Sequence, residues 1–392
     1  MFARLVRLTR LTRLTRLAGP ALVALPLLAA ACGDNLTPLE PDAALPPDAE
    51  LPGNSMAAAV SGDFNVTGVF STMDVVTKVA TPNALAGVAG GDPYLRRYGD
   101  ELFIINRDRG ENVTVLGGRP LALVDQFATG AGSNPQDVAA VGGKLYVPAL
   151  GTAGVVIINR TTRASSVLAF PTIDPDNKPD CVSAYPSGTR VFVVCGTLDA
   201  MFTPRGPATV VVIDTTRDAV EATFALPAAN PVGMIVSTAP AATLGGDLLV
   251  PLAPSFTSTA TGCLARIRTT GTPAAGGCLV RNADLGAYVS RAAMSADGTK
   301  LWLAAALYAP DFSSQSGALR SFDVGRGTLD ASASPATQQI LDVATCPDGR
   351  VVVGDTKAGA AGLRVYSGGV EETTAPVAIG RPPGAGNALV CW

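Results

Sequence analysis

The chain has 392 residues, a formal net charge of −3, 42 Gly, 30 Pro and no His. Without His, the sequence excludes Ser-His-Asp and Cys-His catalysis as well as His-ligated zinc sites. The length fits one large repeat domain, and the many Gly and Pro residues indicate frequent turns.

The first 31 residues have the pattern of an export signal. Five Arg and no acidic residue precede an apolar stretch of about 15 residues, which is too short for a comfortable membrane span and typical of a signal peptide. The stretch ends in Leu28-Ala29-Ala30-Ala31-Cys32-Gly33. This end resembles a bacterial lipobox, apart from Ala29, where that family prefers Leu. The resemblance implies that Cys32 is lipidated, with palmitate, and becomes the first mature residue. Ordinary secretory cleavage near Ala31 is the alternative.

A lipidated Cys32 implies a lipid anchor in the cell envelope, and Gly33 after it favours the outer membrane. Residues 32–55 alternate Pro with Asp and Glu, which predicts a disordered, extended tether. Removal of residues 1–31 takes away five Arg and changes the net charge from −3 to −8. Because no basic patch then remains, the sequence argues against a nucleic-acid partner. We expect a monomer.

Short apolar runs separated by Gly, Pro, Asp and Asn clusters begin at residue 56 and predict β-strands and turns. One recurring element is an apolar strand that closes in a polar turn. Its seven copies lie at residues 66–70, 113–116, 155–159, 210–214, 264–268, 319–323 and 363–367. A second element is a pair of strands joined by a tight turn. Its turns are Gly99-Asp100, Gly142-Gly143, Ser187-Gly188, Gly245-Gly246, Asp297-Gly298 and Asp348-Gly349. Seven units average about 48 residues with four short strands each, which is the period of a β-propeller blade.

Two stretches resemble the YVTN-type repeat of surface proteins. One runs Asn134-Pro135-Gln136-Asp137-Val138, then Gly143-Lys144-Leu145-Tyr146-Val147 and Val156-Ile157-Ile158-Asn159; the other is Pro207-Ala208-Thr209-Val210-Val211-Val212-Ile213-Asp214-Thr215-Thr216. The resemblance covers about residues 90–390 and implies an all-β, seven-bladed β-propeller, which we place at residues 56–392.

The two ends of this region predict how the ring closes. Residues 56–60, 65–71 and 75–80 have the pattern of three strands, and residues 387–392 read as a lone innermost strand. Strands from both ends would then share one blade, which protects the sheet edges.

Six Cys remain if Cys32 carries lipid, and an even number in an exported protein predicts disulfides. The first two of the predicted pairs flank turn signals and would bridge the strands of a hairpin. For the first pair, a three-residue loop at 187–189 would place the two Cys opposite each other. The third pair is the remaining one and would join innermost strands of adjacent blades. The predicted pairs are Cys181–Cys195, Cys263–Cys278 and Cys346–Cys391. Buried free thiols are the alternative.

Ligands of propellers bind at the mouth of the central channel, where the innermost strands begin. Four aspartates precede predicted innermost strands, with Arg291 at a similar place in another repeat: Asp92, Asp137, Asp180 and Asp342. Converging carboxylates would be able to hold Ca²⁺, which takes six to eight oxygen ligands. This arrangement resembles lactonase-type propellers, which implies a divalent-metal-dependent lactonase or hydrolase with an acidic channel. Their Glu-Asn-Asp pattern cannot be placed residue by residue, and we prefer the interpretation that each Asp caps its own turn.

Three longer segments, 198–208, 252–262 and 307–317, lie between the predicted second and third strands of their blades, so they project from one face. Among small polar residues they carry the aromatic residues Phe202, Phe256, Tyr308 and Phe312. Exposed aromatic rings among small polar residues are typical of a recognition surface, and neutral surface variation is the alternative.

The leading hypothesis is therefore a lipid-anchored propeller of the cell envelope that binds a protein or envelope ligand without a cofactor. The metal-dependent lactonase is the second hypothesis, and a purely structural envelope component is the third. The sequence marks no catalytic residue.

Overall fold

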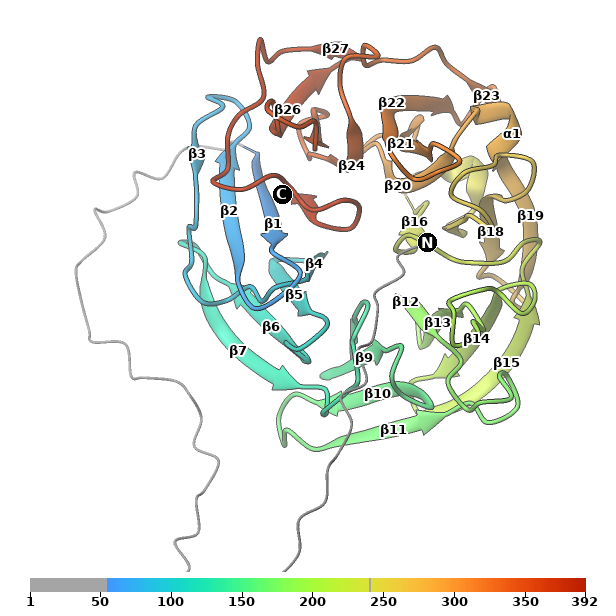
Figure 1. Ribbon diagram of the computed structural model, residues 1–392. Coiled ribbons are helices and arrows are strands. Elements are labelled where there is room, and N and C mark those ends of the chain that lie inside the picture. The colour runs from blue at the N-terminus through green and yellow to red at the C-terminus, as the bar shows by residue number, and fades with distance from the viewer. Residues whose placement is uncertain (1–54, 240) are drawn as a thin grey trace, which may run out of the picture. The chain divides into compact units, whose positions relative to one another are not determined.

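Seven four-stranded antiparallel sheets stand around a common axis as the blades of a propeller (Figure 1). The all-β, seven-bladed fold predicted from the repeat is confirmed. The computed structural model describes residues 55–239 and 241–392. The predicted signal peptide, the lipidation site Cys32 and the predicted tether as far as residue 54 lie outside the described residues. No helix in the described ranges has the length and apolar character needed to cross a membrane.

The first four blades are formed as follows, with the innermost strand of each blade given first. Blade 1 contains β28 (Leu389–Cys391), β1 (Met56–Gly62), β2 (Gly68–Asp74) and β3 (Ala80–Thr81). Blade 2 contains β4 (Pro93–Tyr98), β5 (Glu101–Asn106), β6 (Asn112–Gly117) and β7 (Ala122–Ala128). Blade 3 contains β8 (Ala139–Val141), β9 (Lys144–Pro148), β10 (Gly154–Asn159) and β11 (Ser165–Ala169). Blade 4 contains β12 (Cys181–Ser187), β13 (Arg190–Cys195), β14 (Thr209–Asp214) and β15 (Ala219–Ala225).

The remaining blades follow the same order. Blade 5 contains β16 (Val236–Ser237), β17 (Leu248–Leu252), β18 (Cys263–Arg268) and β19 (Ala274–Arg281). Blade 6 contains β20 (Tyr288–Met294), β21 (Lys300–Tyr308), β22 (Gln315–Asp323) and β23 (Thr328–Leu329). Blade 7 contains β24 (Ile340–Thr345), β25 (Val351–Asp355), β26 (Gly362–Ser367) and β27 (Val370–Glu371). A 3-10 turn, η1 (Ala242–Leu244), and a one-turn helix, α1 (Asn282–Leu285), lie in blade 5 and in the connection to blade 6.

Each blade buries both faces of its sheet against its neighbours. In β5 the five residues 102–106 are all buried, without the alternation of a half-exposed strand. The buried apolar residues form a hydrophobic cluster at each of the seven interfaces between neighbouring blades. Phe70 and Ile104, for example, meet between blades 1 and 2. The main core is thus a ring of interfaces around the axis.

The turns between inner strands explain why Gly recurs in the sequence. Gly142 and Gly143 have φ values of 60° and 76° and join β8 to β9, where Val141 pairs with Lys144. A two-residue hairpin turn with positive φ at both positions suits Gly, which has no Cβ to clash in that region. The Gly-Gly signal in the sequence therefore predicts this turn correctly.

The ring closes as predicted, with strands from both ends of the described region in blade 1. Ala57 pairs with Cys391 and Ala59 with Leu389. Met56 and Trp392 exchange two backbone hydrogen bonds of 2.7 and 2.8 Å. The Cys346–Cys391 disulfide ties the end of β24 in blade 7 to β28 in blade 1. The other two disulfides, Cys181–Cys195 and Cys263–Cys278, are also present as predicted.

Two local predictions are wrong by small amounts. The hairpin of blade 4 turns at residues 188–189, because Ser187 pairs with Arg190, and a bulge between Cys181 and Ser183 restores the pairing of the two Cys. In blade 1, residues 75–79 form a turn instead of a strand. The carboxylate of Asp74 causes this turn, since it accepts hydrogen bonds from the backbone N–H groups of residues 76 and 77.

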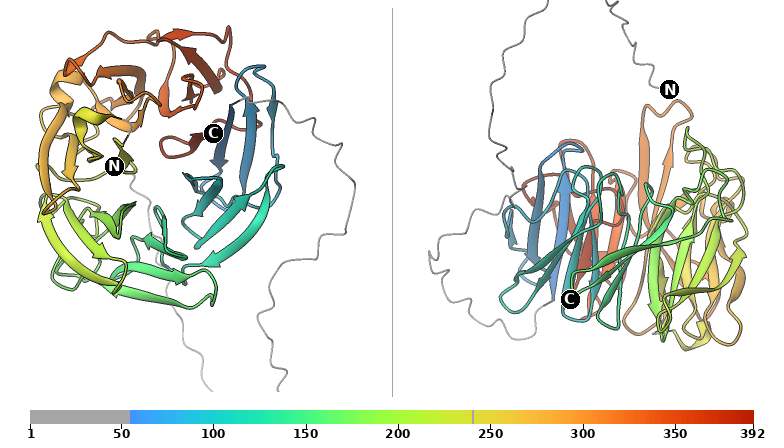
Figure 2. Two further views of the ribbon diagram at one scale, coloured as in Figure 1. Left: turned by 180° about the vertical axis from the view of Figure 1, so that it is seen from behind. Right: turned by 90° about the horizontal axis from the view of Figure 1, so that it is seen from below.

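The segment 307–317 differs most from its prediction, because it extends a hairpin and is not a long loop. Strands β21 and β22 stay paired from Lys300–Asp323 up to Tyr308–Gln315. This long hairpin, drawn in orange, rises above one face of the propeller in the right-hand view of Figure 2. It therefore forms a wall beside the mouth of the channel.

Candidate ligand pocket at the channel mouth

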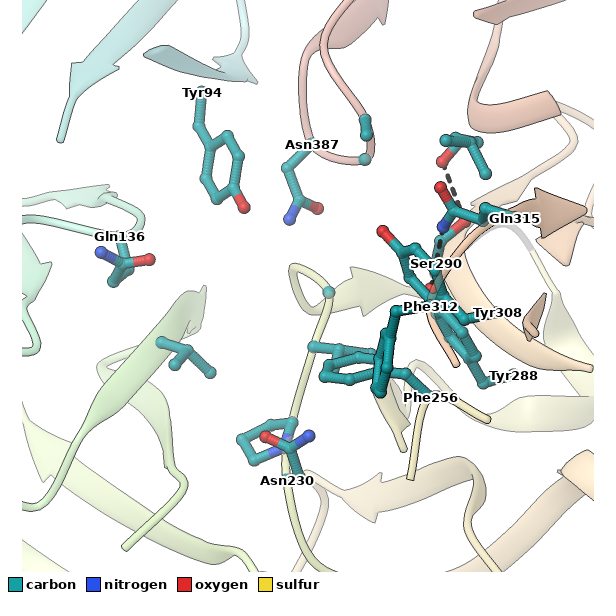
Figure 3. Close-up of a pocket in the computed structure, with 17 residues that line it drawn as sticks. Tyr94, Gln136, Asn230, Phe256, Tyr288, Ser290, Tyr308, Phe312, Gln315 and Asn387 are labelled. Atoms are coloured by element: carbon teal, nitrogen blue, oxygen red, sulfur yellow. Dashed lines mark hydrogen bonds between the residues drawn. The ribbon is translucent and has the colours of Figure 1, made fainter. Parts of the chain in front are cut away.

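A pocket of about 470 Å³ lies on the propeller axis, and all seven blades contribute to it. Its lining residues come from the first residues of innermost strands, from the segments that precede those strands, and from the blade 5 and blade 6 connections (Figure 3). They are Tyr94, Gln136, Val182, Asn230, Pro231, Val232, Gly233, Phe256, Tyr288, Ser290, Tyr308, Phe312, Gln315, Leu341, Ala385, Gly386 and Asn387. We call this cavity the axial pocket. Within the described part of the chain, none of its lining residues carries a formal charge.

Four aromatic rings from blades 5 and 6 form one side of the axial pocket, and we call them the aromatic wall: Phe256, Tyr288, Tyr308 and Phe312. The Phe256 ring lies edge-to-face on Tyr288, with centroids 5.3 Å apart, and on Tyr308, at 6.4 Å. Tyr308 and Phe312 follow at 5.5 Å. These separations are those of attractive aromatic pairs.

Backbone hydrogen bonds hold the aromatic wall in place. The Tyr308 N–H donates to the Phe256 carbonyl at 2.9 Å and so joins the β21–β22 hairpin to the β17–β18 connection. At the hairpin tip, Asp311 accepts hydrogen bonds from the N–H and hydroxyl of Ser313. Tyr288 is 5% exposed, whereas Phe312 at the rim is 56% exposed. The wall thus runs from a buried base to a rim open to solvent.

Asn387 forms the floor of the axial pocket (Figure 3). It belongs to the C-terminal segment, which reaches towards the axis in Figure 1. Its side-chain oxygen accepts hydrogen bonds from Met234 N–H at 2.9 Å and from Arg291 Nη1 at 3.0 Å. Two donors fix the orientation of the amide, so Nδ2 faces the pocket (Figure 3). Among the described residues, Nδ2 has no hydrogen-bond partner, although Asn387 is only 3% exposed.

Arg291 and Asp342 support this floor from the innermost strands of blades 6 and 7. Asp342 accepts a hydrogen bond of 2.6 Å from Ala388 N–H, and its carboxylate lies 3.9 Å from Arg291 Nε. Burial opposes ionisation and raises the pKa of Asp342 to about 6. Burial likewise lowers the pKa of Arg291. The pair therefore holds the C-terminal segment in the channel.

A second buried ion pair lies further along the channel than the pocket. Arg96, one of its members, follows the lining residue Tyr94 by two positions on β4, so both side chains are on the same face of the strand. Arg96 binds both carboxylate oxygens of Asp137, with Nε at 2.9 Å from Oδ1. Ser183 donates to Asp137 at 2.6 Å, and Arg96 Nη1 donates to the Ile235 carbonyl. Burial opposes the Arg96 charge, but the Asp137 carboxylate outweighs it and raises the pKa of Arg96. This network links blades 2, 3, 4 and 5 around the axis.

The four aspartates proposed for calcium are bound to different partners. Asp137 and Asp342 lie on the axis with Arg96 and Arg291, respectively. Asp92 is held by Arg107 through both oxygens, at 2.8 and 2.7 Å. Asp180 accepts a hydrogen bond of 2.7 Å from the backbone N–H of residue 198, and burial raises its pKa to about 6.

The four carboxylates are thus held in separate interactions, and the calcium alternative stays a hypothesis. Within residues 55–239 and 241–392, no three Asp, Glu or Cys side chains are grouped so that they would hold a metal ion. The sequence shows each Asp next to an innermost strand, but for Asp137 and Asp342 it does not show the Arg that faces them from another blade.

Three of the four residues predicted for the binding face meet in the axial pocket: Phe256, Tyr308 and Phe312. Phe202 does not line it. That residue sits in a tight turn, where its N–H donates to the Asp199 carbonyl at 2.8 Å, and it is 71% exposed. Sequence reasoning missed Tyr94 and Tyr288 as pocket residues, although both lie at the start of innermost strands, close to the positions of the four predicted aspartates.

Solved structures share this fold at low sequence identity. A protein from Lactobacillus plantarum is 14% identical, with a TM-score of 0.54, over 86% of this chain and 98% of that one. A 6-phosphogluconolactonase-like protein from Bacteroides uniformis is 13% identical, with a TM-score of 0.50, over 83% and 98%. No protein-family model and no curated protein matches the sequence. These similarities show the propeller fold alone, and the YVTN-type resemblance stays a prediction.

Proposed function

We propose that the protein is a lipid-anchored binding module of the bacterial cell envelope and that its ligand occupies the axial pocket. The observation that carries the proposal is the convergence of all seven blades on one pocket that combines an aromatic wall with the Asn387 Nδ2 donor. The oxygen of that amide is held by Met234 and Arg291, while Nδ2 has no hydrogen-bond partner among the described residues. Ligand sites are typically concave and mostly apolar, with a few polar groups that fix orientation. A ligand that offers an acceptor to this donor would be oriented by it.

The cell-envelope part of the proposal rests on the leader and on the disulfides. Three disulfides suit an oxidising compartment outside the cytoplasm. The lipobox-like segment at Cys32 supports a membrane anchor. Replacing Cys32 with Ser should release the protein from membrane fractions into the soluble fraction. Retention of Cys32→Ser that still requires detergent for release would contradict lipidation.

The lactonase hypothesis receives less support from the site. A phosphorylated sugar lactone, the kind of substrate that the name of the B. uniformis neighbour implies, carries a strong negative charge. Burying that charge without a paired cation is costly, and no lining residue among those described is charged. Arg107 contacts the lining residues Tyr94 and Gln136 but is already paired with Asp92. Arg291 donates to Asn387 and lies beside Asp342.

Capture from an envelope extract tests the binding proposal. The full chain is immobilised as wild type, as Tyr308→Ala and as Phe202→Ala, which alters an exposed ring outside the axial pocket. We expect the wild type and Phe202→Ala to retain the same component and Tyr308→Ala to lose it, with all three melting at similar temperatures. Equal capture by all three proteins, or loss through Phe202→Ala alone, would overturn the proposal.

A further inference from the structure

The chemistry of the axial pocket indicates the class of its ligand, an inference that rests on the proposed function. We infer that the axial pocket binds a neutral saccharide. Sugar rings present apolar C–H faces that pack on aromatic rings, and their hydroxyl groups both donate and accept hydrogen bonds. The aromatic wall supplies the ring surfaces, and uncharged amides supply the polar contacts.

The amides of the axial pocket offer both donors and acceptors to a ligand. Asn387 Nδ2 is a donor without a partner in the described part of the protein, as stated above. Gln315 donates through Nε2 to the Tyr288 hydroxyl at 3.2 Å, and Asn230 donates through Nδ2 to the Ala253 carbonyl at 2.7 Å. Their side-chain oxygens have no hydrogen-bond partner among the described residues, so they remain acceptors. Hydroxyl groups can satisfy all three at once.

The surrounding charges argue against an anionic ligand. Arg96 is bound to Asp137, Arg107 is bound to Asp92, and Arg291 donates to Asn387 beside Asp342. No Arg or Lys lines the axial pocket within the described chain. A carboxylate or phosphate would have to give up its water without gaining a cation, which is unfavourable.

The arrangement of the polar groups also favours a saccharide over an extended peptide. A peptide that adds to a sheet pairs with a row of backbone N–H and C=O groups along one strand edge. Here the unpartnered groups are single side chains that come from blades 1, 5 and 6. The volume of about 470 Å³ suits a short oligosaccharide, within the range of roughly 300–1,000 Å³ usual for small-ligand sites.

An array of immobilised oligosaccharides, neutral and anionic, tests the inference directly, with acetyl-Gly-Tyr-Gly-amide as a neutral peptide probe. We expect the full chain to bind at least one neutral saccharide and no uronate or sugar phosphate. Calorimetric titration of that saccharide should show at least tenfold weaker binding for Tyr308→Ala and for Asn387→Asp, which keeps the size of the side chain but replaces the donor. Phe202→Ala should bind like the wild type.

Three results would overturn the inference: no neutral saccharide on the array binds, an anionic sugar or the peptide binds better, or both pocket variants bind normally. If Asn387→Asp does not fold, Phe256→Leu, which removes one ring of the aromatic wall, takes its place. Pocket-dependent capture from the envelope extract without any saccharide binding would refute this inference and leave the proposed function standing. Saccharide binding that is unchanged in the pocket variants would refute both this inference and the proposed function.

Discussion

Replacing both Cys346 and Cys391 with Ala removes the disulfide that links blade 7 to blade 1 and leaves the rest of the sequence unchanged. We call this place, where the ring closes, the seam. The disulfide encloses 45 residues, whereas the hairpin disulfide Cys181–Cys195 encloses 14. By loop-closure entropy, the longer bridge stabilises the fold by about 4 kcal/mol and the shorter one by about 3 kcal/mol. Both variants remove two buried Sγ atoms, so the packing loss is similar and the difference reports loop closure.

Guanidinium unfolding followed by circular dichroism gives the two free energies of unfolding. Trp392 reports the seam itself, because it follows Cys391 and exchanges backbone hydrogen bonds with Met56. In a Trp302→Phe background it is the one Trp left, so its fluorescence should change at lower denaturant once the seam bridge is gone. The reasoning is refuted if the seam variant loses no more stability than the hairpin variant and Trp392 still reports a single transition with circular dichroism.

Two further predictions concern the buried ion pairs. Asp137→Asn leaves the Arg96 guanidinium buried without its carboxylate and should lower the free energy of unfolding by about 3–5 kcal/mol. The control Asp125→Asn, in an exposed pair with Arg163, should lower it by less than about 1 kcal/mol. Equal decreases in denaturant unfolding would contradict the prediction for the buried pair. The pKa of Asp342 is about 6 in the folded protein, above the ordinary aspartate value of 3.8 that applies to the unfolded chain, so the folded protein binds more protons between these two values. The contribution of Asp342 to stability is then fully present below about pH 4 and is lost as pH rises through about 6. The wild type should therefore gain stability relative to Asp342→Asn as the pH falls across this window. A stability difference that does not change with pH would contradict the raised pKa of Asp342.

The sequence carries much of the fold because each blade repeats the same local signals. Gly142-Gly143 specifies a hairpin turn by its conformational freedom, and the apolar runs have the length of short strands. The Cys spacing predicts all three disulfides. The register of strand pairing is harder to predict from the sequence. A bulge at residue 182 changes which residues of β12 and β13 face each other, and no residue type there indicates it.

The pocket could be predicted only in part, because it forms where residues from all blades meet. The aromatic residues Phe256, Tyr308 and Phe312 stand out in the sequence as rings among small polar residues, and they do come together. Asn387 does not stand out, since its role depends on Met234 and Arg291 reaching it from other blades. For the same reason, Asp137 resembles a metal ligand in the sequence, where nothing marks Arg96 of the neighbouring blade as its partner.

Hydrogen–deuterium exchange with a saturating neutral oligosaccharide from the array most directly tests whether the axial pocket is the binding site. The account predicts slower exchange confined to the segments 230–233, 254–257, 308–315 and 385–387, which come from three different blades and meet only in the closed ring. Protection at residues 198–204 or on the outer strands, or no protection at saturation, would contradict it.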